Sequence, residues 1–233
     1  RVNGHLENES YEIGRAKAFS PGWLENGSIW LHMEYKYILE LLKKGLYDTF
    51  YDVFETAGVL FQAPERYKRS IFENSSFILS SLNSDELNHG RGYIARLSGA
   101  TAEYLQMWTI MAFGNQPFHE QSGSLVFKPT PVLKGTMFTN DAQTIDLQIS
   151  ETVKQSLALA KNTFTARFLG HTIVTYHNDN RKDTFGDNKA TIDYYLLQYS
   201  DGSTKTVNEP VLVGTYAEDV RDGNIEKVDI YLK

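Results

Sequence analysis

Cysteine is absent from the 233-residue sequence. Without a thiol the chain can form neither a disulfide framework nor a metal site with thiolate ligands. An oxidising compartment is therefore neither required nor excluded. His171 and His177 lie six positions apart without acidic neighbours placed to complete a metal site, so we expect no bound metal. A P-loop, a dinucleotide-binding fingerprint and a nucleophile elbow are also missing from the sequence.

The sequence also lacks a long apolar run and a basic tract. No stretch of about 18 apolar residues occurs, so we expect no segment that spans a bilayer. The start, Arg1-Val2-Asn3-Gly4, has no apolar core of a signal peptide and no initiator Met, which suggests a processed chain or a piece of a longer protein. A net charge of −6, with scattered Lys and Arg, argues against nucleic acid or an anionic membrane as partner. A small phosphate ion can still bind where backbone donors gather locally.

Aromatic residues are present in quantity, at 13% of the chain with 14 Tyr and 13 Phe. Carbohydrate-binding proteins often use such rings against the faces of sugars. A β-rich core, which also favours aromatic residues, accounts for the same composition. Composition alone leaves both interpretations open.

The periodicity of apolar residues changes along the chain. Residues 27–44, 46–60 and 98–113 have helical spacing, with glycines suited to end each helix. From Gly123 onward the period is two, which predicts strands at 124–127, 144–149, 164–169, 171–176, 191–199 and 228–232. These patterns predict an α+β protein, with a helical domain over residues 1–118 and an antiparallel β-sandwich domain over 119–233.

The first candidate motif runs from Glu25 to His32 and reads Glu-Asn-Gly-Ser-Ile-Trp-Leu-His. Seven residues return to nearly the same face of an α-helix, so both side chains can face one cleft if the helix begins early enough. The carboxylate can accept from sugar hydroxyls, and the imidazole can donate to a phosphate oxygen. A helix-capping acid and a structural histidine are the alternative interpretation.

The second candidate motif is Leu-Ser-Gly-Ala-Thr-Ala, from Leu97 to Ala102. Here a glycine-containing loop leads into a helix through Ser98, Gly99 and Thr101. Free N–H groups, a hydroxyl and the positive end of the helix dipole suit an anion. An ordinary serine N-cap is the alternative.

Taken together and in this order, the two motifs resemble the cellobiose- and chitobiose-phosphorylase family. In that family Glu-Asn-Gly-Gly-x-x-x-His opens one of the last helices of an (α/α)6 barrel, and Leu-Thr-Gly-Thr-Ala opens a later one. Phe127-Lys128-Pro129-Thr130-Pro131 resembles the family's first strand after the barrel, and Arg167-Phe168-Leu169-Gly170 a later sandwich strand. The resemblance covers most of the chain, although Ser28 and Ser98 replace a glycine and a threonine.

The resemblance implies that the chain is the C-terminal part of an inverting glycoside phosphorylase, a cytoplasmic enzyme that needs no cofactor and uses inorganic phosphate as co-substrate. It places Glu25 at the acceptor sugar. It makes His32, Ser98 and Gly99 phosphate ligands, and leaves open whether the hydroxyl of Ser98 or of Thr101 meets the phosphate. The family's general acid, an Asp, has no match here, so the catalytic residue is unknown and the chain alone is expected to be inactive.

The implied partners are a sugar and phosphate, with a second copy of the chain or the rest of the parent chain. Two alternatives stay open: an inverting glycoside hydrolase on the same barrel, and a non-catalytic carbohydrate-binding or structural fragment. Consumption of phosphate by the parent protein separates the phosphorylase from the hydrolase.

Overall fold

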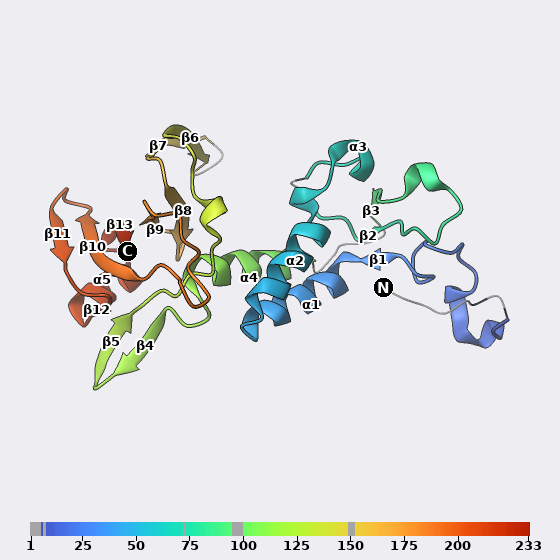
Figure 1. Cartoon of the computed structure of the whole chain (residues 1–233), viewed down its shortest axis with the longest axis horizontal. Helices are drawn as coiled ribbons and strands as arrows, with labels where there is room; N and C mark the ends of the chain where they lie inside the picture. The colour runs from blue at the N-terminus through green and yellow to red at the C-terminus, as the bar shows by residue number, and fades with distance from the viewer. Residues whose placement is uncertain (1–5, 7, 72, 95–99, 149–151) are drawn as a thin grey trace. The chain divides into compact units, whose positions relative to one another are not determined.

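The computed structural model describes residues 6, 8–71, 73–94, 100–148 and 152–233 (Figure 1). The chain forms two compact units, Arg1–Trp108 and Thr109–Lys233. The division falls within helix α4, Ala100–Phe113. The predicted domain boundary after residue 118 stays a prediction.

Two helices of the first unit, α1 Leu31–Lys43 and α2 Tyr47–Ala57, pack against each other. Gly45, with φ +74°, ends α1: its N–H donates to Leu42 O at 3.1 Å and the N–H of Leu46 donates to Leu41 O at 3.0 Å. This pair of bonds is the Schellman motif, which satisfies carbonyls that a helix end leaves open. The buried side chains of the two helices form one apolar layer: Leu31, Tyr35, Ile38, Leu39, Leu41, Leu42, Phe50, Tyr51 and Phe54.

The first unit also contains a three-stranded antiparallel sheet of order β1-β2-β3, which sequence periodicity did not reveal. Its strands are β1 Ile29–Trp30, β2 Phe77–Ile78 and β3 Gly92–Tyr93. The short helical elements of the first unit are η1 Tyr11–Ala16, η2 Val59–Phe61, α3 Pro64–Tyr67 and η3 Glu86–Asn88. The expectation of a purely helical segment before Phe118 is therefore wrong. Strands of two residues are too short to show a period of two, so pairing between distant segments decides their structure.

The second unit is built on a five-stranded sheet of order β11-β10-β13-β9-β8, with a three-stranded sheet β12-β5-β4 and a hairpin β6-β7. The strands are β4 Phe118–Gln121, β5 Ser124–Phe127, β6 Gln143–Gln148, β7 Lys154–Leu159, β8 Thr163–Phe168, β9 Thr172–His177, β10 Ile192–Tyr199, β11 Thr204–Val207, β12 Leu212–Val213 and β13 Ile225–Leu232. A 3-10 turn, η4 Gly135–Met137, and one helix, α5 Thr215–Asp222, complete the unit. The predicted mixed α+β class, with antiparallel sheets, is confirmed.

One pair in the large sheet departs from the expected antiparallel arrangement. Strand β13 pairs with β9 in parallel, from Lys227↔Ile173 to Tyr231↔His177. Parallel neighbours need a long connection. Here the chain passes through β10, β11, β12 and α5 before it returns as β13.

A cluster of phenylalanines joins the two larger sheets of the second unit. The Phe168 ring of β8 lies 5.4 Å from that of Phe127 in β5 and 5.7 Å from that of Phe118 in β4. Phe113, at the end of α4, lies 4.4 Å from the same Phe168 ring. The buried Tyr176 hydroxyl donates to Ala112 O at 2.7 Å, and burial raises the pKa of this phenol. The strand sequences thus bury one aromatic face between the two sheets.

Gly135→Ala is expected to destabilise the second unit by about 1–3 kcal/mol, because the added methyl group has no space at this closely packed position. A Cβ at Gly135 would lie 1.9 Å from the carbonyl oxygen of Arg181. That carbonyl cannot easily retreat, since the Arg181 guanidinium donates to Thr139 O at 2.9 Å and to Phe138 O at 3.1 Å. Urea unfolding measures the change, with the exposed neighbour Thr136→Ala as control. Equal unfolding midpoints for the two variants would show that the backbone at Arg181 moves to accommodate the added methyl group.

Candidate functional site

The loop that carries Glu25 is held by its own hydrogen bonds. The N–H of Gly22 donates to Asn26 O at 2.7 Å, and the N–H of Asn26 donates to Trp23 O at 3.0 Å. The Asn26 side chain, which is buried, donates from Nδ2 to Phe19 O at 2.7 Å. The Asn-Gly part of the motif therefore forms a turn, and the hydrogen bonds of Asn26 stabilise that turn.

The carbonyl of Leu24 is the acceptor on which the rest of the loop converges. It accepts from Ser28 Oγ at 2.5 Å and from Trp30 Nε1 at 3.2 Å. Leu24 itself has φ +45°, a conformation that a side-chain-bearing residue keeps where its surroundings hold it. Ser28, which replaces the second glycine of the resembled motif, thus adds a buried bond that fixes the loop.

A second loop clamps the first from outside. The N–H of Ser80 donates to Gly22 O at 3.2 Å, and Asn83 Nδ2 donates to Pro21 O at 2.7 Å. Gly22 has φ +80°, and a Cβ there would lie 2.7 Å from Asn83 N, so this position requires glycine. The backbone that presents Glu25 is therefore rigidly positioned.

Glu25 lies in this loop and not on a helix, which corrects the helical argument for its pairing with His32. Strand β1 pairs Ile29 with Ile78 and Trp30 with Phe77, and this pairing keeps the chain extended until α1 begins at Leu31. Glu25 Oε1 accepts from Arg15 Nη2 at 2.5 Å, and the carboxylate side chain is 28% exposed. The Arg15 guanidinium therefore holds one carboxylate oxygen, and the other oxygen, Oε2, is buried.

His32 is the second residue of α1 and is half-buried. Its ring lies 5.8 Å from that of Trp30, with an angle of 80° between the ring planes. The preceding N–H, that of Leu31, donates to Ser76 O at 3.1 Å, so β2 and its neighbour fix the helix start. An imidazole positioned in this way can donate to an anion or to a sugar oxygen.

Four aromatic rings cluster on one face of the small sheet. Trp23 lies 4.5 Å from Tyr93 and 5.0 Å from Phe77, and Trp30 lies 5.5 Å from Phe77. The Arg91 guanidinium lies over Tyr93, 5.3 Å from the ring centroid. We call Trp23, Trp30, Phe77 and Tyr93 the aromatic cluster. Trp23, Trp30 and Tyr93 are half-buried, which leaves part of their area for a ligand.

The second motif is described in part. Ser98 and Gly99 lie outside the described residues, and Thr101 is exposed in the first turn of α4. Three residues beyond His32 and Thr101 are Tyr35 and Tyr104, whose rings stack at 5.8 Å. Three residues rise about 4.5 Å along a helix, so this stack brings the first turns of α1 and α4 near each other. The convergence of His32 with Ser98 stays a prediction.

Sequence reasoning missed Phe77 and Tyr93 as neighbours of Trp23 and Trp30. They come from strands of two residues that lie far along the chain from the first motif. The signal that was available is the high aromatic content, which carries no information on which rings meet.

Comparison with known proteins adds no assignment: no family model matches the chain, and neither does any curated protein. Within the described residues, no group of three or more His, Asp or Glu side chains is arranged to hold a metal ion. None of the helices in the same part of the chain combines the length and the apolar character needed to cross a membrane.

Proposed function

We propose that this chain is the C-terminal part of an inverting glycoside phosphorylase that cleaves β-linked di- or oligosaccharides to an α-sugar 1-phosphate. One observation carries most of the weight. A hydrogen-bonded loop carries Glu25, whose side chain is 28% exposed, in the same unit as a half-buried imidazole, His32, that adjoins the aromatic cluster. Carboxylate, imidazole and aromatic rings are the groups that bind a sugar beside an anion.

The proposal assigns the acceptor side to Glu25 and to the aromatic cluster. A carboxylate binds sugar hydroxyls because it accepts hydrogen bonds without donating any. Aromatic rings pack against the apolar C–H faces of a sugar. Because Arg15 already donates to Oε1 of Glu25, the carboxylate is oriented before the sugar arrives.

The proposal assigns phosphate binding to His32, with Ser98, Gly99 and Thr101 as further hydrogen-bond donors. The support is the stack of Tyr35 on Tyr104, which brings the first turns of α1 and α4 near each other. The N-terminus of a helix provides free N–H groups and a positive dipole end for an anion. A barrel end for the first unit, a β-sandwich for the second and the cytoplasmic location belong to the same proposal.

In the proposed reaction, phosphate attacks the anomeric carbon in line while a carboxylic acid protonates the leaving oxygen from the other face. Phosphate takes the place of the water used by inverting hydrolases. Since phosphate is already nucleophilic, the chain must supply positioning and anion binding more than proton abstraction. The proton donor is assigned to the part of the enzyme outside this chain.

The test is an assay of the complete enzyme with β-linked disaccharides and inorganic phosphate, followed by phosphorus NMR. The proposal expects an α-sugar 1-phosphate to appear as phosphate is consumed. Release of free sugar without phosphate consumption would identify a hydrolase instead. Sugar binding with no reaction in either direction would identify a binding fragment.

A further inference from the structure

A cavity of about 450 Å³ lies within the first unit, apart from the aromatic cluster. Its floor includes Ile29 and Ile78, which are register partners in β1 and β2. The aromatic side chains Trp30 and Phe77 occupy the next register pair. Since successive strand residues point to opposite faces, the cavity lies on the other face of the sheet from the aromatic cluster. It is therefore a second site.

Two opposite charges line this cavity without neutralising each other. Glu34 projects from α1 and Arg66 from α3, and neither side chain makes a hydrogen bond or a salt bridge within the described part of the chain. Gly90 gives the arginine stem room, because a Cβ there would lie 2.6 Å from Arg66 Cγ. The Glu34 carboxylate, an acceptor, and the Arg66 guanidinium, a donor, thus line the same cavity, and one ligand could bind both.

Two of the remaining polar side chains of the cavity are held by hydrogen bonds. His89 also lines it, and its Nε2 bonds to Asn83 O at 2.7 Å, which orients the ring. Gln62 donates from Nε2 to Thr56 O at 2.8 Å, and the hydroxyl residues Ser80 and Ser81 complete the wall. The cavity wall therefore combines hydrogen-bond donors and acceptors with apolar side chains.

We propose that this cavity binds a neutral polyhydroxylated ligand, a saccharide of one or two rings. Phosphate would be repelled by Glu34, and a simple cation by Arg66, whereas hydroxyl groups can donate to the first and accept from the second. The isoleucine floor matches the apolar face of a sugar ring. The volume lies within the range of small-molecule sites, about 300–1,000 Å³. This inference stands on the cavity's own residues and does not rest on the phosphorylase proposal.

The experiment uses the 233-residue chain labelled at its isoleucine methyl groups, titrated separately with cellobiose, maltose, chitobiose, glycine and inorganic phosphate. Methyl signals of Ile29 and Ile78 report the cavity itself, so binding at Glu25 and His32 is distinguished from binding here. We expect at least one saccharide to shift both signals. Glu34→Gln and Arg66→Gln should each lower the affinity for that saccharide about tenfold or more, as expected when a hydrogen bond to a charged group is lost.

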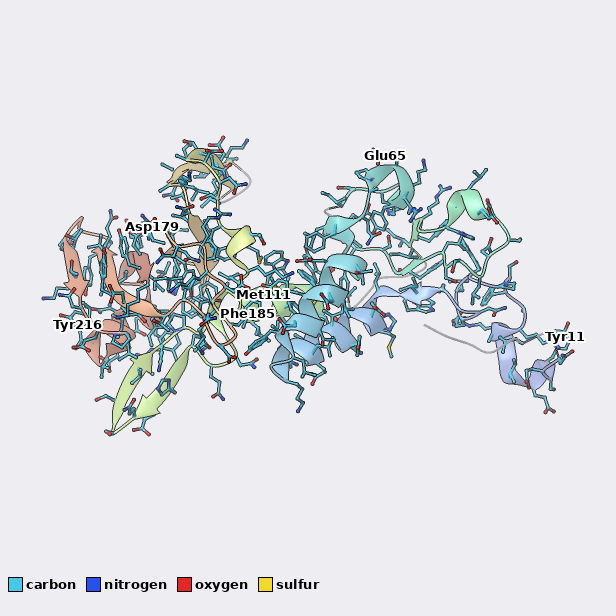
Figure 2. All side chains as sticks on the ribbon, viewed as in Figure 1. Tyr11, Glu65, Met111, Asp179, Phe185 and Tyr216 are labelled. Atoms are coloured by element: carbon cyan, nitrogen blue, oxygen red, sulfur yellow. The ribbon has the colours of Figure 1, made fainter. Side chains whose placement is uncertain are left out.

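Matched controls are Glu65→Gln on α3, a residue labelled in Figure 2, and Lys36→Gln on α1, both exposed and outside the cavity lining. They should leave the affinity unchanged. Ser81→Trp fills the cavity mouth from an exposed position and should abolish the shifts without removing a charge. The proposal is overturned if no saccharide shifts Ile29 and Ile78 up to about 10 mM, a concentration well above a millimolar Kd. It is also overturned if glycine or phosphate alone produces the shifts, since a zwitterion or an anion is then the ligand.

Discussion

His32→Ala is expected to lower the phosphorolysis rate of the complete enzyme by about two to three orders of magnitude, as for a lost oxyanion-type donor. The loss should appear as a strongly raised requirement for phosphate, with sugar binding largely intact. The reason is that the imidazole, half-buried at the start of α1, is the proposed donor to the phosphate oxygen. Saturation curves with phosphate varied in one series and acceptor sugar in the other measure the split.

Glu25→Ala should give the opposite split, with weakened acceptor recognition and little change in the phosphate requirement. A carboxylate repels phosphate and suits hydroxyl groups, so its removal affects the sugar. Because Glu25 also binds Arg15, the variant Arg15→Gln tests whether that ion pair alone is responsible. His119→Ala, at an exposed position on β4, serves as the histidine control and should leave both curves unchanged.

Equal modest losses on both axes for His32→Ala and Glu25→Ala would contradict these roles. Both residues would then support the fold alone. Isothermal titration of the 233-residue chain with inorganic phosphate gives an independent reading, because His32→Ala should weaken phosphate binding even where no reaction occurs. Unchanged phosphate affinity in that titration would remove His32 from the site.

Sequence periodicity predicted those elements whose structure is decided locally. The run that became α1 has an apolar stripe and ends at Gly45, and the run that became β10 buries Tyr195 and Leu197, which lie two positions apart. Strand β9 appeared within one residue of its predicted bounds, at Thr172–His177. In these segments the burial pattern repeats often enough within one element to be read from the chain.

The elements that were missed depend on distant partners. Strand β1 exists because Ile29 and Trp30 pair with Ile78 and Phe77. A strand of two residues is too short for its sequence to predict that pairing. Helix α5 was also missed. It spans eight residues, of which Ala217 and Val220 are buried, so its apolar stripe is minimal. Tertiary context decided these segments, against weak local signals.

The candidate site divides in the same way. The Glu25–His32 motif pointed to a turn followed by a helix, and both exist. Sequence reasoning let Glu25 share a helix face with His32 if the helix began early enough, but α1 begins at Leu31, and Ser28 and Trp30 bind the carbonyl of Leu24 in a separate loop. The position of Tyr93 beside Trp23 required the fold, because those residues meet only through the sheet.

Asp229→Asn is expected to cost about 3 kcal/mol of unfolding free energy at neutral pH, as for a buried ion pair that loses one partner. Asp229 lies in β13 with its side chain 9% exposed. Its Oδ1 accepts from His177 Nε2 at 2.7 Å, and its Oδ2 accepts from Lys227 Nζ at 2.9 Å. The amide keeps the size of the side chain but removes its charge, and one of its two termini can no longer accept.

The same substitution should change how stability depends on pH. Burial raises the pKa of Asp229, but the hydrogen bonds from His177 and Lys227 outweigh burial and hold that pKa below its ordinary value of 3.8. The carboxylate therefore stabilises the fold fully above its unfolded pKa, about 3.9, and this contribution is lost as the pH falls through the lower folded pKa. Tyr231 stacks on His177, and Tyr194 stacks on Tyr231. Burial, together with the charge of Asp229, raises the pKa of Tyr231.

Urea unfolding of the original chain and of Asp229→Asn, from neutral pH to below pH 4, tests both expectations. The difference in unfolding free energy should be largest near neutral pH and should shrink below about pH 4, where the original carboxylate takes up a proton. Asp193→Asn is the matched control. Asp193 also accepts from a lysine, Lys233, but these side chains are 46% and 64% exposed, so its loss should cost at most about 1 kcal/mol. If the two variants lose the same stability, or if the Asp229 difference is independent of pH, then the shape of that side chain and not its charge holds β13 beside β9.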